Sequence, residues 1–160
     1  MARCIIYYSY SGTTRRLAKK VKAACGADSI EVTSNKTYNA LTVYPLGSYR
    51  ASKGEKDPIE PKKIDVTRYD LIILGTPVWA WKPTPAMNAA IAALKGCEGK
   101  KAIIFATCGG QPGKTIDIMK KQLESQGVKV IGDFIFNRKD VRDGKKINEL
   151  IVSVNATITE

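Results

Sequence analysis

The segment that decides the fold lies near the start of the chain, where residues 4–14 read CIIYYSYSGTT. Five residues suited to a β-strand come first, a loop rich in hydroxyl groups follows, and a helical pattern comes next. Hydroxyl side chains, a glycine that allows close backbone approach and the free N–H groups of a helix N-terminus together favour anion binding. The alternative interpretation is an ordinary helix cap, which needs one hydroxyl and binds nothing.

The loop in this segment supplies the first candidate binding residues, which are Ser9, Tyr10, Ser11, Gly12, Thr13 and Thr14. Serine or threonine occupies four of these six positions, which is more than a single cap requires, so the loop favours a phosphate ligand. It lacks the G-x-G-x-x-G spacing that holds a pyrophosphate. We therefore expect a terminal monophosphate.

Four further segments have the composition of strands, and they span residues 29–32, 71–75, 102–107 and 128–136. The apolar runs at 72–74 and 103–105 are continuous, as in parallel strands that helices cover on both faces. Helical patterns separate the strands. Strand and helix in alternation predict an α/β fold, a three-layer α/β/α sandwich around a five-stranded parallel sheet.

Apolar residues spaced three and four apart mark one buried face on each predicted helix. We expect these residues in the core: Leu17, Val21 and Ala24; Met87, Ala90, Ile91 and Leu94; Ile116, Met119 and Leu123; Ile147, Leu150, Ile151, Val154 and Ile158. Residues 33–63 have no convincing helical period. They predict a long excursion between the second and third strands, with room for a short helix, and long loops of this kind are often functional.

The composition predicts one domain over residues 1–160, of 17.5 kDa with 44% hydrophobic residues. The chain contains no histidine, which excludes imidazole-based catalysis and histidine-ligated metals. Its four cysteines show no C-x-x-C spacing, so we expect reduced thiols and no metal site. No apolar stretch has the length of a signal peptide or membrane span, which favours a cytoplasmic protein without membrane contact.

A second candidate loop follows the third strand and contains Pro77, Val78, Trp79, Ala80 and Trp81, including both tryptophans of the chain. In open α/β sheets, ligands bind at the C-terminal ends of the strands. We therefore expect this aromatic loop to cover a planar ring, with Trp79 favoured for stacking. The alternative is that the two indoles only plug the end of the sheet or fill an interface.

A third candidate loop follows the fourth strand and contains Thr107, Cys108, Gly109 and Gly110. Residues 113–115 read GKT, like the end of a nucleotide-binding P-loop, but Cys108 stands where that motif needs its first glycine. Pro112 also removes a backbone donor. We expect Cys108 to line the site as a small residue, since no histidine is present to activate it as a nucleophile.

The first loop resembles the phosphate motif T/S-x-T/S-G-x-T of the flavodoxin family, and the G-T/S-P-x-W pattern at residues 75–79 resembles its flavin loop. The resemblance extends over nearly the whole chain. It implies the strand order 2-1-3-4-5 and a bound FMN, whose phosphate lies in the first loop. It further implies that the second loop contacts the isoalloxazine and that small residues of the third loop approach its pyrimidine edge. The cofactor then supplies the redox chemistry, and no catalytic side chain is needed.

Four functions remain open at this stage, and one of them, a P-loop-like nucleotide-binding protein, rests only on the partial motif at residues 113–115. An electron carrier needs an exposed flavin edge and redox partner proteins, whereas an FMN-dependent NAD(P)H or quinone reductase needs a second pocket for a small-molecule acceptor, which residues 33–63 are placed to wall. A nucleic-acid-binding protein is suggested only by the net charge of +11, and a solvated basic helix face is the more usual explanation. Flavodoxins are typically acidic, so this basic chain departs from the family and favours acidic partners.

Overall fold

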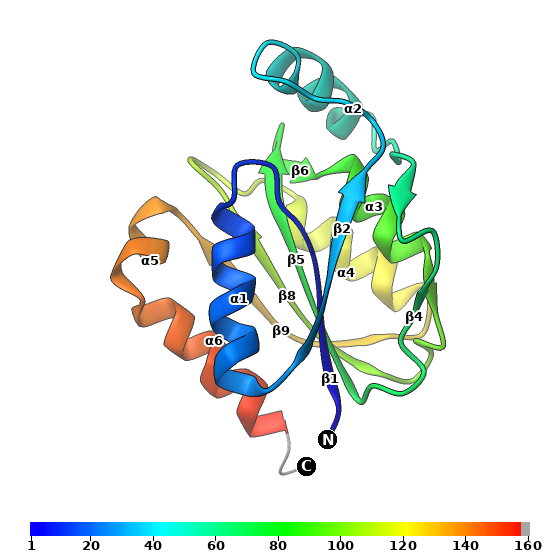
Figure 1. The fold of residues 1–160 in the computed structure, drawn as a ribbon, viewed down its shortest axis with the longest axis vertical. Helices are drawn as coiled ribbons and strands as arrows, with labels where there is room; N and C mark the ends of the chain where they lie inside the picture. Colours follow the sequence, from blue (N-terminus) through cyan, green and yellow to red (C-terminus); the bar gives the residue numbers. More distant parts are fainter. Residues whose placement is uncertain (158–160) are drawn as a thin grey trace.

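The computed structural model describes residues 1–157, and its centre is a parallel β-sheet. The parallel strands are β1 (Arg3–Tyr8), β2 (Asp28–Ser34), β5 (Leu71–Trp79), β8 (Lys101–Thr107) and β9 (Lys129–Phe136). They lie in the order β2-β1-β5-β8-β9, which confirms the predicted order 2-1-3-4-5 (Figure 1). Because these strands are parallel and run upward in Figure 1, their C-terminal ends meet at the upper edge of the sheet.

Two-residue strands extend this pattern, and the sequence did not indicate them. In the central sheet, β3 (Ile59–Glu60) pairs antiparallel with β2, and β6 (Lys82–Pro83) pairs antiparallel with β5. A separate pair joins β4 (Ile64–Asp65) to β7 (Leu94–Lys95). Strand β5 also runs beyond its predicted end at residue 75, because Thr76 and Pro77 still pair with β8 and the last two residues pair with β6.

Helices cover both faces of the sheet. On one face lie α1 (Thr13–Cys25), α5 (Arg138–Asp143) and α6 (Lys145–Ala156); on the other lie α3 (Pro85–Ala92) and α4 (Thr115–Glu124) (Figure 1). Strand residues alternate between the two cores. Ile5, Ile73 and Ile103 lie in register and pack with α1 and α6, whereas the next residue of each strand packs with α3 and α4.

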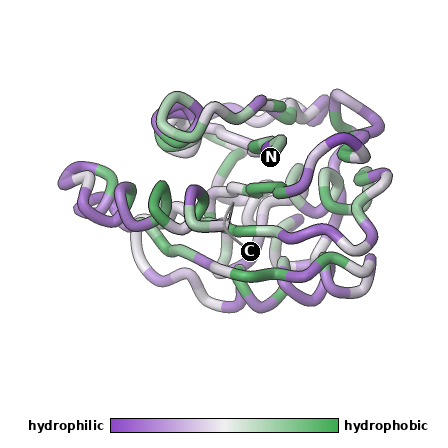
Figure 2. The backbone as a smooth tube through the Cα atoms, turned by 90° about the horizontal axis from the view of Figure 1, so that it is seen from below, coloured by the Kyte–Doolittle hydropathy of each residue, from purple (hydrophilic) through white to green (hydrophobic). Residues whose placement is uncertain are grey.

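The hydropathy of the chain follows these layers. Figure 2 shows hydrophobic segments crossing the middle of the molecule, with hydrophilic segments around its outside. Gly75 of β5 makes room for the Phe105 ring of β8, because a Cβ at this position would lie 2.1 Å from that ring. Within residues 1–157 no helix is both long and apolar enough to cross a bilayer.

The predicted helix faces are correct except at a few positions. Ala24 is exposed, so its assignment to the core was wrong: the buried face of α1 passes through Leu17, Val21 and Cys25 instead. Ile116 and Ile151 are only partly buried. Leu94 is buried as expected, but it lies in β7 and not on a helix, because α3 ends at Ala92. Ile158 lies outside the described residues.

The excursion, residues 33–63, contains a π-helical turn η1 (Val43–Gly47) and one short helix α2 (Ser48–Ser52). It stands above the C-terminal ends of the strands (Figure 1). The Asp57 carboxylate, only 1% exposed, fixes it by accepting hydrogen bonds from the hydroxyls of Ser34 at 2.8 Å and Tyr38 at 2.9 Å. Arg50 completes the network with an ion pair to Asp57 at 2.8 Å. The excursion is therefore anchored to the sheet rather than loose.

Candidate functional site

The loop after β1 turns sharply into α1, and its geometry leaves part of the helix N-terminus open. Gly12 is the N-cap residue, with φ of 100°, and has no side chain with which to cap the helix. A residue with a Cβ is strained in this conformation, which explains the glycine. The first N–H groups of α1 have no acceptor within the helix and carry partial positive charge. This end of α1 suits an anion.

The hydroxyl groups of the loop divide into two sets. The Ser9 hydroxyl accepts hydrogen bonds from the N–H groups of Gly12 and Arg15, both at 3.2 Å, so it shapes the turn. Thr14 is buried, and its hydroxyl lies 2.8 Å from that of Thr107 at the end of β8. Ser11 and Thr13 instead face the cavity described below, with their hydroxyl oxygens 3.4 Å apart. The latter pair is the one available to a ligand.

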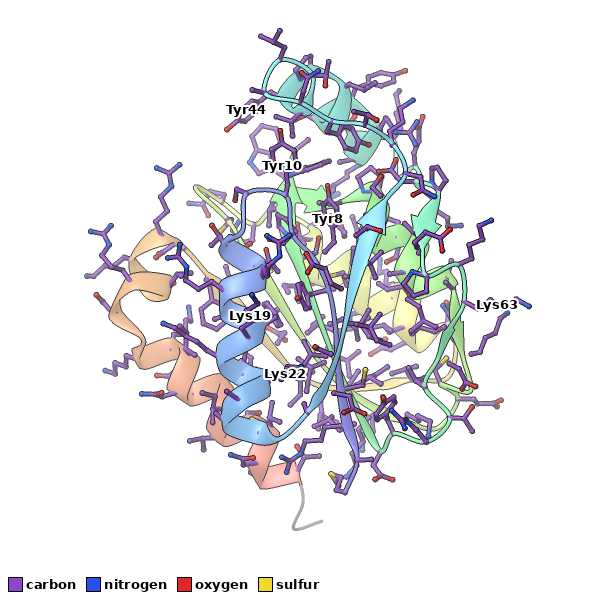
Figure 3. The ribbon with its side chains drawn as sticks, viewed as in Figure 1. Tyr8, Tyr10, Lys19, Lys22, Tyr44 and Lys63 are labelled. Atoms are coloured by element: carbon purple, nitrogen blue, oxygen red, sulfur yellow. The ribbon has the colours of Figure 1, made fainter. Side chains whose placement is uncertain are left out.

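Trp79, at the end of β5, lies in an aromatic cluster at the upper edge of the sheet. Its ring meets those of Tyr8, Tyr10 and Tyr38 edge to face, at centroid distances of 5.9, 6.1 and 5.2 Å. Figure 3 shows Tyr8 and Tyr10 between the sheet and the excursion, with Tyr44 above them. The indole also fits against Gly47, where a Cβ would lie 2.9 Å from the ring. Trp79 is therefore held on several sides.

Trp81 is more exposed, at 65%, and its backbone holds an uncommon conformation. Ala80 and Trp81 have φ of 49° and 62°, in the left-handed region that residues with a Cβ seldom adopt. Gly113 packs against the backbone of Trp81, and the Lys114 N–H donates to the Trp81 carbonyl at 2.9 Å. The GKT segment at residues 113–115 thus supports the turn at Ala80 and Trp81, whereas a P-loop directs its backbone N–H groups toward a phosphate.

The loop after β8 presents small groups to the same region. Its start is fixed by the Thr14 to Thr107 contact and by the Cys108 N–H, which donates to the Phe136 carbonyl at 2.9 Å. The Cys108 thiol is partly exposed and lies 3.3 Å from the Gly110 carbonyl. Burial, with a smaller contribution from the Asp140 carboxylate, raises the pKa of this thiol. It is therefore a poor nucleophile at neutral pH.

The three loops converge on one cavity of about 710 Å³, which lies within the range of roughly 300–1,000 Å³ typical of small-molecule sites. Of the predicted site residues, the following line it: Tyr10, Ser11, Thr13, Pro77, Val78, Trp79, Ala80, Trp81, Thr107, Cys108, Gly109 and Gly110. Ser9, Gly12 and Thr14 do not line the cavity. They lie directly behind its wall, where they shape the first loop.

Sequence reasoning missed part of the lining. Val43, Tyr44 and Ser48 come from the excursion, and Gln111 comes from the third loop. Phe136 ends β9, Asn137 follows it, and Arg138 and Val141 belong to α5. The excursion residues had no periodic pattern to identify them. Arg138 and Asn137 follow the last parallel strand, so the rule that ligands bind at strand C-terminal ends could have indicated them.

Comparisons with known proteins agree with this geometry. Residues 3–149 match the family model described as Flavodoxin. The chain belongs to the flavodoxin family. No curated protein sequence is significantly similar to it.

Solved structures with a similar fold agree with this family assignment. A protein from Bacteroides eggerthii, provisionally described as a flavoprotein, is 25% identical, with a TM-score of 0.75 over 96% of this chain and 98% of its own. A flavoprotein from Lactobacillus acidophilus, solved in complex with FMN, is 25% identical, with a TM-score of 0.71 over 89% and 97% of the two chains. Two-electron reduced flavodoxin from Megasphaera elsdenii shares the fold, at 20% identity and a TM-score of 0.57 over 94% and 98%.

Proposed function

We propose that this flavodoxin-family protein binds FMN noncovalently in the cavity and takes part in electron transfer. The observation that carries the proposal is the union, in one cavity, of a hydroxyl-lined helix N-terminus with an aromatic wall. FMN carries the two groups that match these features, a phosphate for the helix N-terminus and a planar ring for the aromatic wall. The Lactobacillus acidophilus relative solved with FMN adds support.

Each wall of the cavity has a defined task in this proposal. Ser11, Thr13 and those N–H groups at the start of α1 that do not donate to Ser9 would hold the phosphate. The indoles of Trp79 and Trp81 would cover the ring and exclude water from it, while the small residues Gly109 and Gly110 let the backbone come close to its polar edge. When bound, FMN supplies the transfer of electrons.

Titration with FMN tests the proposal most directly. Binding should quench tryptophan fluorescence, because both indoles line the cavity. Riboflavin, which has the ring without the phosphate, is the matched control ligand. The double variant Ser11→Ala/Thr13→Ala should lose about tenfold or more in FMN affinity, equivalent to about 1.4 kcal/mol, with riboflavin binding almost unchanged. Failure of the wild-type protein to bind FMN at micromolar concentration refutes the proposal.

A second candidate is an FMN-dependent reductase that passes electrons from NAD(P)H to a quinone or similar small molecule. The side of the cavity formed by Val43, Tyr44 and Ser48 favours the reductase, since the excursion is placed to enclose a second pocket beside the ring. Steady-state oxidation of NAD(P)H with a quinone separates the candidates. Rapid turnover supports the reductase, whereas absent turnover together with fast electron exchange with redox proteins supports the carrier.

A further inference from the structure

The excess positive charge of the chain is concentrated on one side of the sheet. Helices α1, α5 and α6 together carry ten lysines and arginines against three acidic residues, an excess of seven out of the net charge of +11. The opposite layer is balanced: α3 has no charged residue, and α4 has two lysines against Asp117 and Glu124. The asymmetry is therefore a property of one face, which we call the basic face.

Most cations of the basic face remain available to a partner. Arg15 is paired with Glu31, and Lys146 lies 3.6 Å from Asp140. Arg16, Lys20, Lys139 and Arg142 are exposed, and none of them has an acidic partner within 4 Å among residues 1–157. Figure 3 shows Lys19 and Lys22 along α1 as well. Unpaired cations that crowd one face repel each other, a cost that an acidic partner relieves.

The basic face leads directly to the cavity. Helix α1 begins at Thr13 and α5 begins at Arg138, and both residues line the cavity. Exposed aromatic side chains, Tyr10, Tyr44 and Trp81, surround the same opening. Aromatic groups beside arginines are typical of protein–protein interfaces. A molecule docked on the basic face would therefore lie at the cavity opening.

We propose that the basic face docks the acidic surface of a redox protein, and this rests on the proposed FMN function. The charge pattern favours a protein over a nucleic acid, because Asp140, Asp143 and Glu149 lie among the cations. A uniformly charged phosphate backbone is repelled by these carboxylates, whereas a folded protein can place its own lysines against them. The charge also steers the partner toward the cavity.

Two double variants on the basic face and one control test the docking. Arg16→Glu/Lys20→Glu alters α1 and Lys139→Glu/Arg142→Glu alters α5. The control, Lys62→Glu/Lys63→Glu, makes the same change in net charge at exposed positions, and Figure 3 shows Lys63 on the side of the molecule away from α1. The probe is a negatively charged plant-type [2Fe–2S] ferredoxin, titrated calorimetrically into the protein with and without FMN, at low and high salt.

We expect salt-sensitive binding that weakens about tenfold or more in each basic-face variant and about threefold or less in the control. Equal weakening in all three variants, or no binding of the ferredoxin, overturns the proposal. The proposal is also overturned if the protein selectively binds a DNA duplex or anionic lipid vesicles and the basic-face variants abolish that binding. FMN titration of every variant keeps the two proposals apart. If the wild-type protein binds FMN and not the ferredoxin, the docking proposal alone is refuted. If it binds the ferredoxin and not FMN, the proposed function is refuted.

Discussion

The ring of Tyr38 meets the ring of Trp79 edge to face, 5.2 Å between centroids and with 80° between planes. This contact joins the excursion to the end of β5. Tyr38 is itself fixed by Asp57, and Gly47 packs against another part of the same indole. The excursion thus sets the position of the aromatic wall, although it contributes no residue to the phosphate loop.

Gly47→Ala should move this wall. The backbone at Gly47 is helical, with φ of −62°, so alanine is conformationally acceptable, but its Cβ would lie 2.9 Å from the Trp79 ring. Either the indole or the excursion must shift. We expect FMN affinity to fall about tenfold, with a changed tryptophan emission spectrum. Gly132→Ala is the control, because its Cβ would meet nothing closer than 3.7 Å; equal losses in the two variants would contradict the interpretation.

The sheet could be predicted because its central strands are buried on both faces. That environment selects unbroken runs of large apolar residues, such as Ile72 to Leu74. Strands β3 and β6 could not be predicted, since two residues hold no periodic pattern. Ala24 misled the helix prediction because alanine is compatible with both a core and an exposed helix position.

Tyr38→Phe should lower the free energy of unfolding at neutral pH and make that free energy fall less steeply at high pH. Burial, helped by the hydrogen bond to the Asp57 carboxylate, raises the pKa of Tyr38 from 10.0 to about 12. A phenol with a raised pKa stabilises the fold fully below pH 10 and loses this contribution as pH rises toward 12. Without the hydroxyl, we expect a loss of about 2 kcal/mol at pH 7, the usual size for a hydrogen bond to a charged acceptor. We also expect a shallower decline above pH 10.

Urea denaturation at a series of pH values measures both effects of this substitution. Tyr44→Phe provides the control, because Tyr44 is 79% exposed and should change neither the neutral stability nor its alkaline slope. Tyrosinate absorbance gives an independent reading, since one late-titrating group should disappear from the Tyr38→Phe protein. An unchanged alkaline slope would mean that Tyr38 ionises freely in the fold.

The candidate site could be predicted where its residue types depart from what packing alone requires. The hydroxyls around Gly12 and the paired tryptophans do so, and of these residues Ser11, Thr13, Trp79 and Trp81 line the cavity. Tyr44 and Arg138 reach the cavity only through tertiary structure. One lies in a segment without periodicity, and the other begins a helix that the sequence did not separate from α6.

Alkylation should distinguish Cys108 from the other three thiols. Cys4, Cys25 and Cys97 are 6% exposed or less, whereas Cys108 is partly exposed and lines the cavity. Iodoacetamide should modify Cys108 first, slowly at neutral pH because its pKa is raised, and faster as pH increases. Bound FMN should slow the reaction. Mass spectrometry identifies the modified residue, and Cys108→Ser should eliminate the first phase; modification of all four thiols at one rate would contradict this assignment.

Arg138→Gln should lower the reduction potential of bound FMN. The guanidinium lines the cavity beside the third loop, where a Cβ on Gly109 would lie 3.9 Å from it. A positive charge there stabilises the additional negative charge of the reduced cofactor. Removal of the charge should cost of order 1 kcal/mol, or about 20 mV for a two-electron couple.

Lys139→Gln removes the same charge one residue away, outside the cavity lining, so a redox titration should show a clearly smaller shift for it. Equal shifts in the two variants would mean that the potential responds to the net charge of the protein rather than to Arg138.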